Sequence, residues 1–130
     1  MIVVDACVLA DAMMDDGPVG DAARSALSAD LVWAAPTHLF VEVLSVVRKK
    51  ARAGALAPAR AAEIAAALPE LVIDQVDAVQ LTDRIWELRE NLTTYDAAYV
   101  AAAELYECAV VTSDARLAKA PGVRCPVELL

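Results

Sequence analysis

The sequence predicts an α/β sandwich, in which helices cover both faces of a parallel β-sheet. Two observations predict this fold class. Short strand-like runs alternate with longer helical stretches along the whole chain, and several of those runs are apolar at every position, as in strands buried on both faces. The chain of 130 residues is long enough for one hydrophobic core, so we expect a single domain over residues 1–130.

The first predicted strand covers the apolar run Ile2–Val4, which an aspartate ends. A helical stretch over Ala6–Met14 follows. After a short Asp-Asp-Gly-Pro turn, Pro18 suits the first position of a helix over Val19–Ser28. The run Leu31–Ala34 then predicts a second strand. This part of the chain therefore has the order strand, helix, helix, strand.

The strongest helical pattern runs from Thr37 to Ala53. Thr37 is a suitable N-cap, and Gly54 is suited to end the helix. Pro58 opens an alanine-rich helix that ends near Pro69. Leu71–Ile73 supplies the third predicted strand.

The last part of the chain repeats the alternation. A helix is expected over Val76–Glu90, and Thr94 is a suitable N-cap for a helix over Tyr95–Glu107. Ala109–Thr112 is a fourth buried strand, followed by a short helix and a final strand near Val127. Strands that alternate with helices in this way form a parallel sheet.

The composition argues against a membrane protein. Hydrophobic residues make up 59% of the chain, but many are alanines, and no window approaches the ~18 uncharged apolar residues that a spanning helix needs. The N-terminus lacks the basic segment of a signal peptide, so we expect a cytoplasmic location. Cys7, Cys108 and Cys125 form no CxxC pair, and we interpret them as small core residues.

The net charge of −8 argues against a protein that holds nucleic acid by a general basic surface, because such binding depends on neutralising phosphates. Any contact with RNA must therefore be local. The same charge is consistent with carboxylates that converge on one place and await cations, either metal ions or arginines of a partner.

Two aspartates follow buried strands directly. Asp5 comes after the first predicted strand and Asp114 after the fourth, and open α/β sheets place their ligand crevice beyond the carboxyl ends of their strands. Each aspartate is also a suitable N-cap for the helix that follows it, and for Asp5 alone the two interpretations are equally good. If the two strands are neighbours, both acids project from one edge of the sheet.

Glu42 interrupts an apolar helical run, where a charge is expected only if it faces a polar site. His38, Glu42, Ser45 and Lys49 are spaced by four, three and four residues, so they form one polar stripe on the helix. A stripe that simply faces solvent is the alternative, and it remains reasonable for Ser45 and Lys49. For Glu42 we favour a site.

Asp96 lies in the first turn of its predicted helix, where the helix dipole alone could account for it. Together with the other three acids, however, it would complete a group of four carboxylates above one edge of the sheet. Such a cluster needs a compensating cation, and all-oxygen ligands suit Mg²⁺ or Mn²⁺. One ion and two ions are both consistent with the residues.

Four segments together resemble PIN-domain nucleases of the VapC toxin type. They are residues 3–9 (Val-Val-Asp-Ala-Cys-Val-Leu), Glu42, residues 95–101 (Tyr-Asp-Ala-Ala-Tyr-Val-Ala) and residues 111–114 (Val-Thr-Ser-Asp). The resemblance spans essentially the whole chain, and the Tyr-Asp-Ala-Ala-Tyr segment is its most specific part. It implies a three-layer α/β/α sandwich with a central parallel sheet.

The resemblance also implies a function. It implies an endoribonuclease that depends on Mg²⁺ or Mn²⁺, inhibition by a cognate VapB-type antitoxin, a homodimer, and contact with DNA only through the antitoxin. The family's acidic quartet falls on Asp5, Glu42, Asp96 and Asp114, with Asp5 and Asp96 as direct ligands. The expected reaction is phosphodiester hydrolysis by a metal-activated water, leaving 5′-phosphate and 3′-hydroxyl ends.

Residues around the quartet follow the family pattern with one departure. Thr112 or Ser113 matches its hydroxyl-bearing position beside the last acid. Such toxins often carry serine or threonine where this chain has Cys7, and we expect altered hydrogen bonding there rather than loss of the site. His38, one helical turn from Glu42, is a candidate substrate contact rather than a catalyst.

The basic run that contains Arg48, Lys49 and Arg52 lies on the helix of Glu42 and is a candidate RNA contact, together with Arg60. Cations suited to the dipole of a solvated helix end are an equally good explanation. Aspartyl-phosphate enzymes are a poor alternative, because their phosphatases need a second aspartate at position 7 of this chain. A PIN-like subunit with weak catalysis that mainly binds an antitoxin remains an alternative.

Overall fold

The computed structural model of the protein describes residues 1–130 and contains one five-stranded sheet in the order β3-β2-β1-β4-β5. Every pair of neighbouring strands is parallel, as predicted. The strands are β1 (Ile2–Val4), β2 (Trp33–Pro36), β3 (Ile73–Val76), β4 (Ala109–Thr112) and β5 (Val127–Leu129). The helices are α1 (Ala6–Met14), α2 (Pro18–Ala29), α3 (Leu39–Arg52), α4 (Pro58–Ala67), the 3-10 helix η1 (Leu68–Glu70), α5 (Ala78–Glu87), α6 (Thr94–Leu105) and α7 (Ala115–Ala118).

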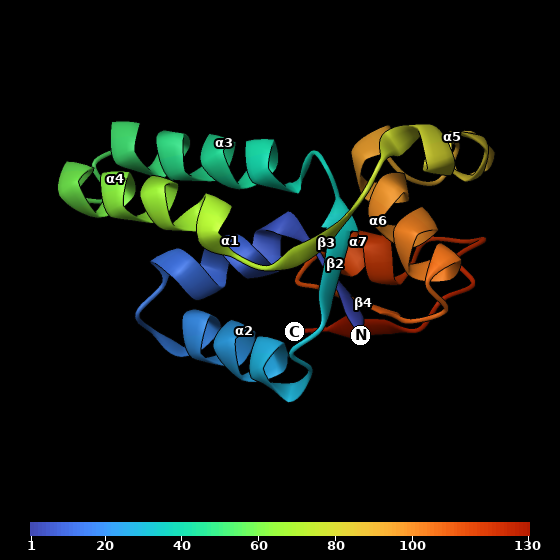
Figure 1. Ribbon diagram of the computed structural model, residues 1–130, viewed down its shortest axis with the longest axis horizontal. Helices are drawn as coiled ribbons and strands as arrows, with labels where there is room; N and C mark the ends of the chain where they lie inside the picture. Colours follow the sequence, from blue (N-terminus) through green and yellow to red (C-terminus); the bar gives the residue numbers. More distant parts are fainter.

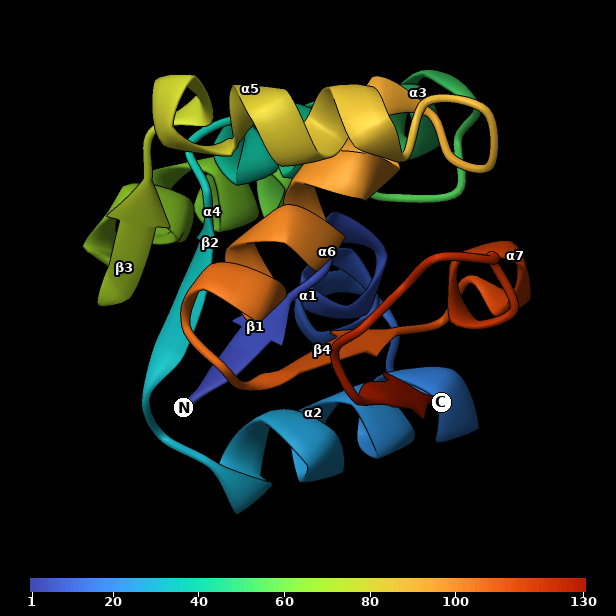
Figure 2. The same cartoon turned by 90° about the vertical axis from the view of Figure 1, so that its right-hand side faces the viewer.

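Helices cover both faces of the sheet. Helices α1 and α2 pack against each other on one side, and α5 and α6 pack against each other on the opposite side (Figures 1 and 2). The hairpin of α3 and α4 lies beyond α1, on the same side. This arrangement confirms the predicted three-layer α/β/α sandwich. None of these helices combines the length and the apolar character needed to cross a membrane.

The core is built around β1 and α6. All three residues of β1 are buried, and so are the seven consecutive residues Ala97–Ala103 of α6. Because most side chains in that stretch are single methyl groups, α6 can pack closely on β1, β2 and β4. The N-terminal turn of α6, which carries Asp96, is thereby held at a defined place over the sheet.

The order of the strands creates a switch point between β1 and β4. The chain builds β2 and β3 on one side of β1, then crosses back and builds β4 and β5 on the other side. Val4 and Val111 are register partners, so β1 and β4 end at the same edge of the sheet. Open α/β sheets bind their ligands at such a point. Asp5 and Asp114 follow these two strand ends.

Two strands begin later in the chain than predicted. The predicted second strand began at Leu31, whereas β2 begins at Trp33, because Trp33 is the register partner of Ile2, the first residue of β1. Ile73 pairs with Trp33 in turn, so β3 also starts late and Val72 is left 92% exposed. The pairing register, which the sequence does not reveal, sets both boundaries.

Helix α3 begins two residues later than predicted. The backbone N–H of Thr37 donates to the carbonyl oxygen of Val76 and prolongs the pairing of β2 with β3, so Thr37 is not the N-cap. His38 is the N-cap and makes no side-chain capping bond. At the other end, Gly54 has a φ of +73°, which confirms its predicted role in ending the helix.

The caps of α5 and α6 also differ from the prediction. Thr93, and not Thr94, caps α6, and its hydroxyl oxygen accepts a hydrogen bond from the backbone of Asp96 at 3.1 Å. Asp77 caps α5 and accepts from the backbone of Val79, so the predicted helix over Val76–Glu90 is shorter at both ends. Thr93 and Thr94 are equally suitable N-caps by sequence, and Val76 could belong either to the strand or to the helix that follows. The sequence alone therefore does not place the starts of α5 and α6.

Candidate active site

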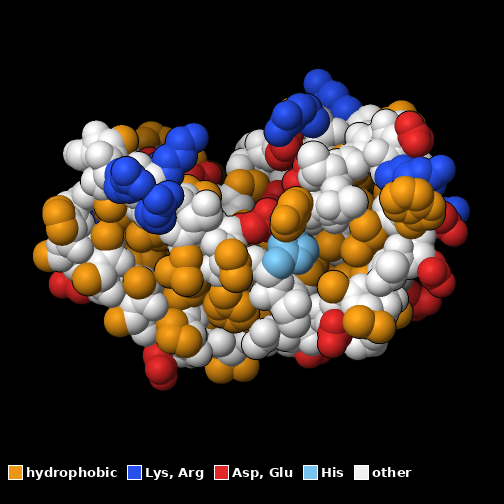
Figure 3. All heavy atoms as spheres, turned by 90° about the horizontal axis from the view of Figure 1, so that it is seen from above, with side chains coloured by type: hydrophobic (Ala, Val, Ile, Leu, Met, Phe, Trp, Pro, Cys, Tyr) orange, Lys and Arg blue, Asp and Glu red, His pale blue; other side chains and the backbone are white.

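A cleft of about 310 Å³ opens above the carboxyl ends of β1 and β4. It is lined by Asp5, Ala6, Cys7, Glu42, Ser45, Val46, Asp96 and Asp114. The structure therefore brings together all four acids that the sequence singled out, each from a different element. Seen from above, acidic side chains gather in a hollow that has basic side chains on either side and the single histidine at its rim (Figure 3).

Asp5 is the most buried of the four acids, with only 6% of its surface exposed. Its Oδ2 accepts hydrogen bonds from Thr112 Oγ1 at 2.5 Å and from Cys7 Sγ at 3.0 Å. The Thr112 hydroxyl oxygen in turn accepts from the backbone N–H of Asp114 at 3.0 Å. Both side-chain donors therefore engage Oδ2, which leaves Oδ1 available for a ligand in the cleft.

Cys7 occupies the position where a hydroxyl is usual in the family that the sequence resembles. Burial, reinforced by the negative charge of Asp5, raises the pKa of the Cys7 thiol to about 11. The thiol is thus protonated near neutral pH and serves as a donor to Asp5. Ser113 contacts the same sulfur through its backbone N–H, at 3.4 Å. Cys7 is therefore part of the cleft and not simply a core residue.

Glu42, on α3, is held by a hydrogen bond from α6, which forms the opposite wall of the cleft. The hydroxyl of the fully buried Tyr99, on α6, donates to Glu42 Oε2 at 2.5 Å, and His38 Nε2 lies 3.6 Å from the same oxygen. Burial raises the pKa of Glu42, and the charges of Asp5 and Asp96 add to the rise, while Tyr99 and His38 oppose it. The long-range partner Tyr99 explains how a charge is accommodated inside an apolar helical run.

Asp96 lies in the first turn of α6, one residue beyond the exposed Tyr95. Burial raises its pKa, and the charges of Asp5 and Asp114 raise it further, whereas a hydrogen bond with Thr93 opposes the rise. The raised pKa values of Asp96 and Glu42 have a common cause, namely half-burial beside other carboxylates. Such a group favours a proton or a cation.

Asp114 differs from the other three acids. Its side chain caps α7 and also binds the guanidinium of Arg116, with Oδ2 to Nη2 at 2.9 Å and Oδ1 to Nε at 3.2 Å. These bonds lower the pKa of Asp114. Asp114 is therefore an N-cap, as one interpretation of the sequence predicts, and it also lines the cleft. The pairing with Arg116 is not predicted from the sequence, although an arginine two residues after a capping acid is a usable signal for it.

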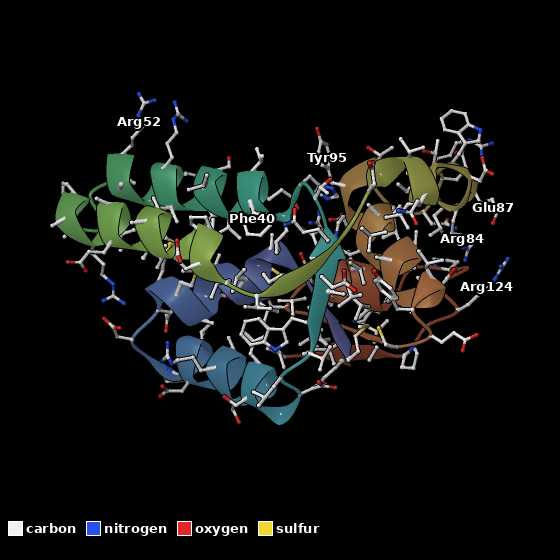
Figure 4. All side chains as sticks on the ribbon, in the orientation of Figure 1. Phe40, Arg52, Arg84, Glu87, Tyr95 and Arg124 are labelled. Atoms are coloured by element: carbon white, nitrogen blue, oxygen red, sulfur yellow. The ribbon has the colours of Figure 1, made fainter.

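The polar stripe on α3 divides into two parts, because Ser45 lines the cleft with Glu42 whereas Lys49 lies outside it. Lys49 is exposed, as are Arg48 and Arg52 of the basic run. Arg52 points away from the body of the protein at the far end of α3 (Figure 4). Arg60 is also a candidate RNA contact by sequence. In the structure it forms a bidentate ion pair with Asp16, with N–O distances of 2.6 and 2.8 Å.

The carboxylates converge without forming a finished ligand cluster. No three acidic, histidine or cysteine side chains are arranged so that they could hold one ion as they stand. Each of three acids is directed to a protein partner, namely Asp5 to Thr112, Glu42 to Tyr99 and Asp114 to Arg116. The donor set nevertheless consists of carboxylate oxygens in one cleft, which is the chemistry that Mg²⁺ and Mn²⁺ prefer.

A parallel α/β/α sandwich with four carboxylates at its switch point defines the class of PIN-like domains. Residues 2–123 match the PIN domain family. The chain is 35% identical over 130 residues to ribonuclease VapC9 of Mycobacterium tuberculosis, an alignment that covers 100% of this chain and 98% of that protein. The chain belongs to the PIN-domain family and, within it, to the VapC ribonucleases.

Solved structures agree on the fold. One is VapC20 of Mycobacterium tuberculosis, described as a toxin that cleaves the sarcin-ricin loop, with a TM-score of 0.70, 18% identity, and coverage of 91% of this chain and 93% of that chain. Another is a toxin-antitoxin complex from Klebsiella pneumoniae, with a TM-score of 0.68, 23% identity, and coverage of 99% and 100%. At these identities the likeness shows the fold alone.

Proposed function

We propose that this protein is the toxin of a VapBC-type toxin–antitoxin module and an endoribonuclease that depends on Mg²⁺ or Mn²⁺. One observation carries the proposal. Four carboxylates from four elements line one cleft at the switch point of the sheet, in a chain whose full length aligns with VapC ribonucleases. We propose Asp5 and Asp96 as direct metal ligands, with Glu42 and Asp114 completing the acidic site.

The residues of the cleft suit this role in different ways. A divalent ion held there supplies Lewis acidity and lowers the pKa of water, which allows phosphodiester hydrolysis near neutral pH. Thr112 and Cys7 fix the carboxylate of Asp5 through Oδ2 and leave Oδ1 for ligation. Tyr99 of α6 donates a hydrogen bond to the carboxylate of Glu42 and thereby fixes that carboxylate on the α3 side of the cleft.

Basic residues on α3, together with Arg116 beside the cleft, are candidates for binding the RNA backbone. Arg48, Lys49 and Arg52 are exposed on α3 and are not engaged in ion pairs. Arg116 is 90% exposed while its guanidinium rests on Asp114, so a phosphate can compete for it without any cost of uncovering buried surface. We propose that these cations compensate locally for a chain of net charge −8.

We further propose a VapB-type antitoxin as the partner, with a cation inserted into the acidic cleft. The Klebsiella pneumoniae neighbour is itself a toxin-antitoxin complex, which supports a partner of this kind. Exposed apolar side chains on α3, Val41 and Leu44, offer further contact surface for the antitoxin or for a second copy in a homodimer. Contact with DNA then occurs only through the antitoxin, in the cytoplasm.

The proposal is tested by incubating purified, antitoxin-free protein with total RNA and Mn²⁺. We expect cleavage that EDTA abolishes and that Asp5→Asn or Asp96→Asn reduces by about 100-fold or more, as loss of a ligating or charge-stabilising group does in other enzymes. Asp83→Asn, an exposed acid on α5, is the matched control and should cleave normally. Cleavage that persists in EDTA and in both cleft variants would defeat the metal-carboxylate mechanism. Absence of any cleavage by the wild-type chain would favour a subunit that mainly binds an antitoxin.

A further inference from the structure

Tyr95 is an exposed aromatic residue at the rim of the acidic cleft. Its side chain is 60% exposed, whereas Tyr99, one helical turn further along α6, is fully buried. The next residue in the chain, Asp96, lines the cleft. In Figure 4 the ring of Tyr95 points out from the start of α6, toward the face that Figure 3 shows from above. An aromatic face is therefore presented beside the carboxylates.

The ring of Tyr95 is braced by His38. The two rings meet edge to face, with centroids 5.5 Å apart and planes at 78°, and His38 meets Tyr99 in the same way at 5.2 Å and 72°. His38 Nε2 is buried and makes no hydrogen bond. The imidazole therefore packs between the exposed and the buried tyrosine, while its Nε2 faces Glu42 Oε2 at 3.6 Å. A braced ring loses little conformational entropy when a ligand stacks on it.

The chemistry of the rim suits a nucleobase. The chain as a whole is acidic, so general contacts to the RNA backbone contribute little affinity. Stacking on an aromatic ring does not depend on net charge and tolerates any base. It requires a base that is unpaired and free to leave its neighbours, which is how sequence-reading proteins commonly contact RNA loops.

We infer that Tyr95, packed against His38, stacks on a base next to the scissile phosphate and so positions the substrate in the cleft. This inference rests on the proposed ribonuclease function and adds a base-binding residue to it. The alternative use of Tyr95, as a contact for a protein partner, leaves RNA affinity unchanged and is separated by the experiment.

The test measures KM and kcat with a short single-stranded RNA that the wild-type protein cleaves in Mn²⁺. Tyr95→Leu removes the ring but keeps similar bulk, and we expect KM to rise roughly 10-fold, in line with the loss of one stacked base. Tyr95→Phe keeps the ring and should retain most of the affinity. Trp86→Leu is the matched control, because Trp86 is a 63% exposed aromatic residue on α5, covered by Arg89 and apart from the cleft residues.

A second arm removes the base instead of the ring. Abasic nucleotides on either side of the cut should raise the KM of the wild type at one position and leave the KM of Tyr95→Leu unchanged there. Equal KM values for the wild type and Tyr95→Leu, or equal abasic losses in both, would overturn the stacking inference while cleavage stands. No cleavage by the wild type would instead overturn the proposed function, and the inference with it.

Discussion

At the scale of the residue, three of the four carboxylates of the cleft are each held by a different side-chain partner. Asp5 is bonded by a hydroxyl and a thiol, Glu42 by a tyrosine, and Asp114 by an arginine. Asp96 and Glu42 have raised pKa values because burial and neighbouring carboxylates disfavour their charged forms. The site therefore stores unfavourable electrostatic energy in the metal-free protein, as functional sites commonly do.

We expect Asp96→Asn to stabilise the metal-free protein while it abolishes cleavage. The amide removes one charge from the cluster and keeps the shape of the side chain. A gain of about 0.5–2 kcal/mol in the free energy of unfolding is typical when a functional-site group is replaced. Urea denaturation at neutral pH in EDTA measures it, with Asp83→Asn on the surface of α5 as the control that should show no gain.

The gain should depend on pH with a defined sign. A carboxyl group whose pKa is higher in the folded than in the unfolded protein binds its proton more tightly when folded, so its contribution to stability is present at low pH and is lost as pH rises through the folded value. The gain of Asp96→Asn should thus vanish well below the ordinary aspartate pKa of 3.8 and grow as pH rises above it. A gain that is independent of pH would contradict the electrostatic explanation.

Tyr99→Phe tests the hydrogen bond that positions Glu42. The variant keeps the buried ring but leaves Glu42 Oε2 without its donor, so we expect a loss of about 1–3 kcal/mol in unfolding free energy and reduced cleavage. Thermal denaturation and the RNA assay measure the two effects. Tyr106→Phe is the control, because the Tyr106 hydroxyl bonds Asp74 at an exposed site. Equal losses in the two variants would show that the bond to Glu42 has no special role.

At the scale of the element, α6 places two of the four acids. Helix α6 carries Asp96 and positions Glu42 of α3 through Tyr99, and the buried middle of α6 anchors this arrangement to the sheet. Arg84 of α5 binds Glu104 of α6 and so links the two helices. Its guanidinium bonds both carboxylate oxygens of Glu104, at 2.6 and 3.0 Å, and the carbonyl oxygen of Gly122 at 2.6 Å.

Arg84→Met should therefore loosen the packing of α5 on α6. The side chains of Arg84 and Glu104 are only 17% and 14% exposed, and removing one partner leaves a largely buried charge, so we expect a loss of about 2–3 kcal/mol. Arg89→Met, which breaks an exposed pair with Glu90, should cost less than about 0.5 kcal/mol. Chemical denaturation compares them. Similar losses of unfolding free energy in the two variants would mean that the hydrogen bonds of Arg84 stabilise the fold no more than an exposed ion pair does.

The basic run of α3 is tested through the salt dependence of RNA binding. If Arg48, Lys49 and Arg52 contact phosphates, replacing all three by glutamine should reduce the slope of log affinity against log salt by about 2, since each contact to a single strand contributes about 0.7. Affinity is measured by filter binding over a range of KCl concentrations.

A matched variant separates local contact from net charge. Neutralising three other exposed cations, Arg89, Lys119 and Arg124, changes the net charge by the same amount and should leave the slope unchanged. An unaltered slope in the α3 variant would identify its cations as a solvated helix end suited to the dipole.

At the scale of the whole molecule, the strand order explains why residues as distant as Asp5 and Asp114 meet. The chain crosses from β3 to β4, past β1 and β2, and thereby sets two strand ends side by side. The charge of the cleft has the same sign as that of the whole molecule, which is −8. The long-range field and the local cluster both favour cations at this edge of the sheet.

A divalent ion should consequently stabilise the folded protein. Mn²⁺ or Mg²⁺ at about 100 times its dissociation constant is expected to add about 2.7 kcal/mol to the free energy of unfolding, because the unfolded chain does not gather the carboxylates. Differential scanning calorimetry in MnCl₂, with NaCl at equal ionic strength as the control, measures the shift in Tm. Asp5→Asn should show no Mn²⁺-specific shift, and an equal shift in this variant would place the ion elsewhere.

The fold class and the alternation of elements follow from the sequence, because apolar runs and helix-end residues are local signals. The sequence also singles out the four acids, three of which end or interrupt an apolar run. The starts of β2 and β3 and the hydrogen-bond partners of Asp5, Glu42 and Asp114 depend instead on tertiary contacts. The reason is physical, because strand register and side-chain pairing join residues whose separation along the chain carries no periodic signal.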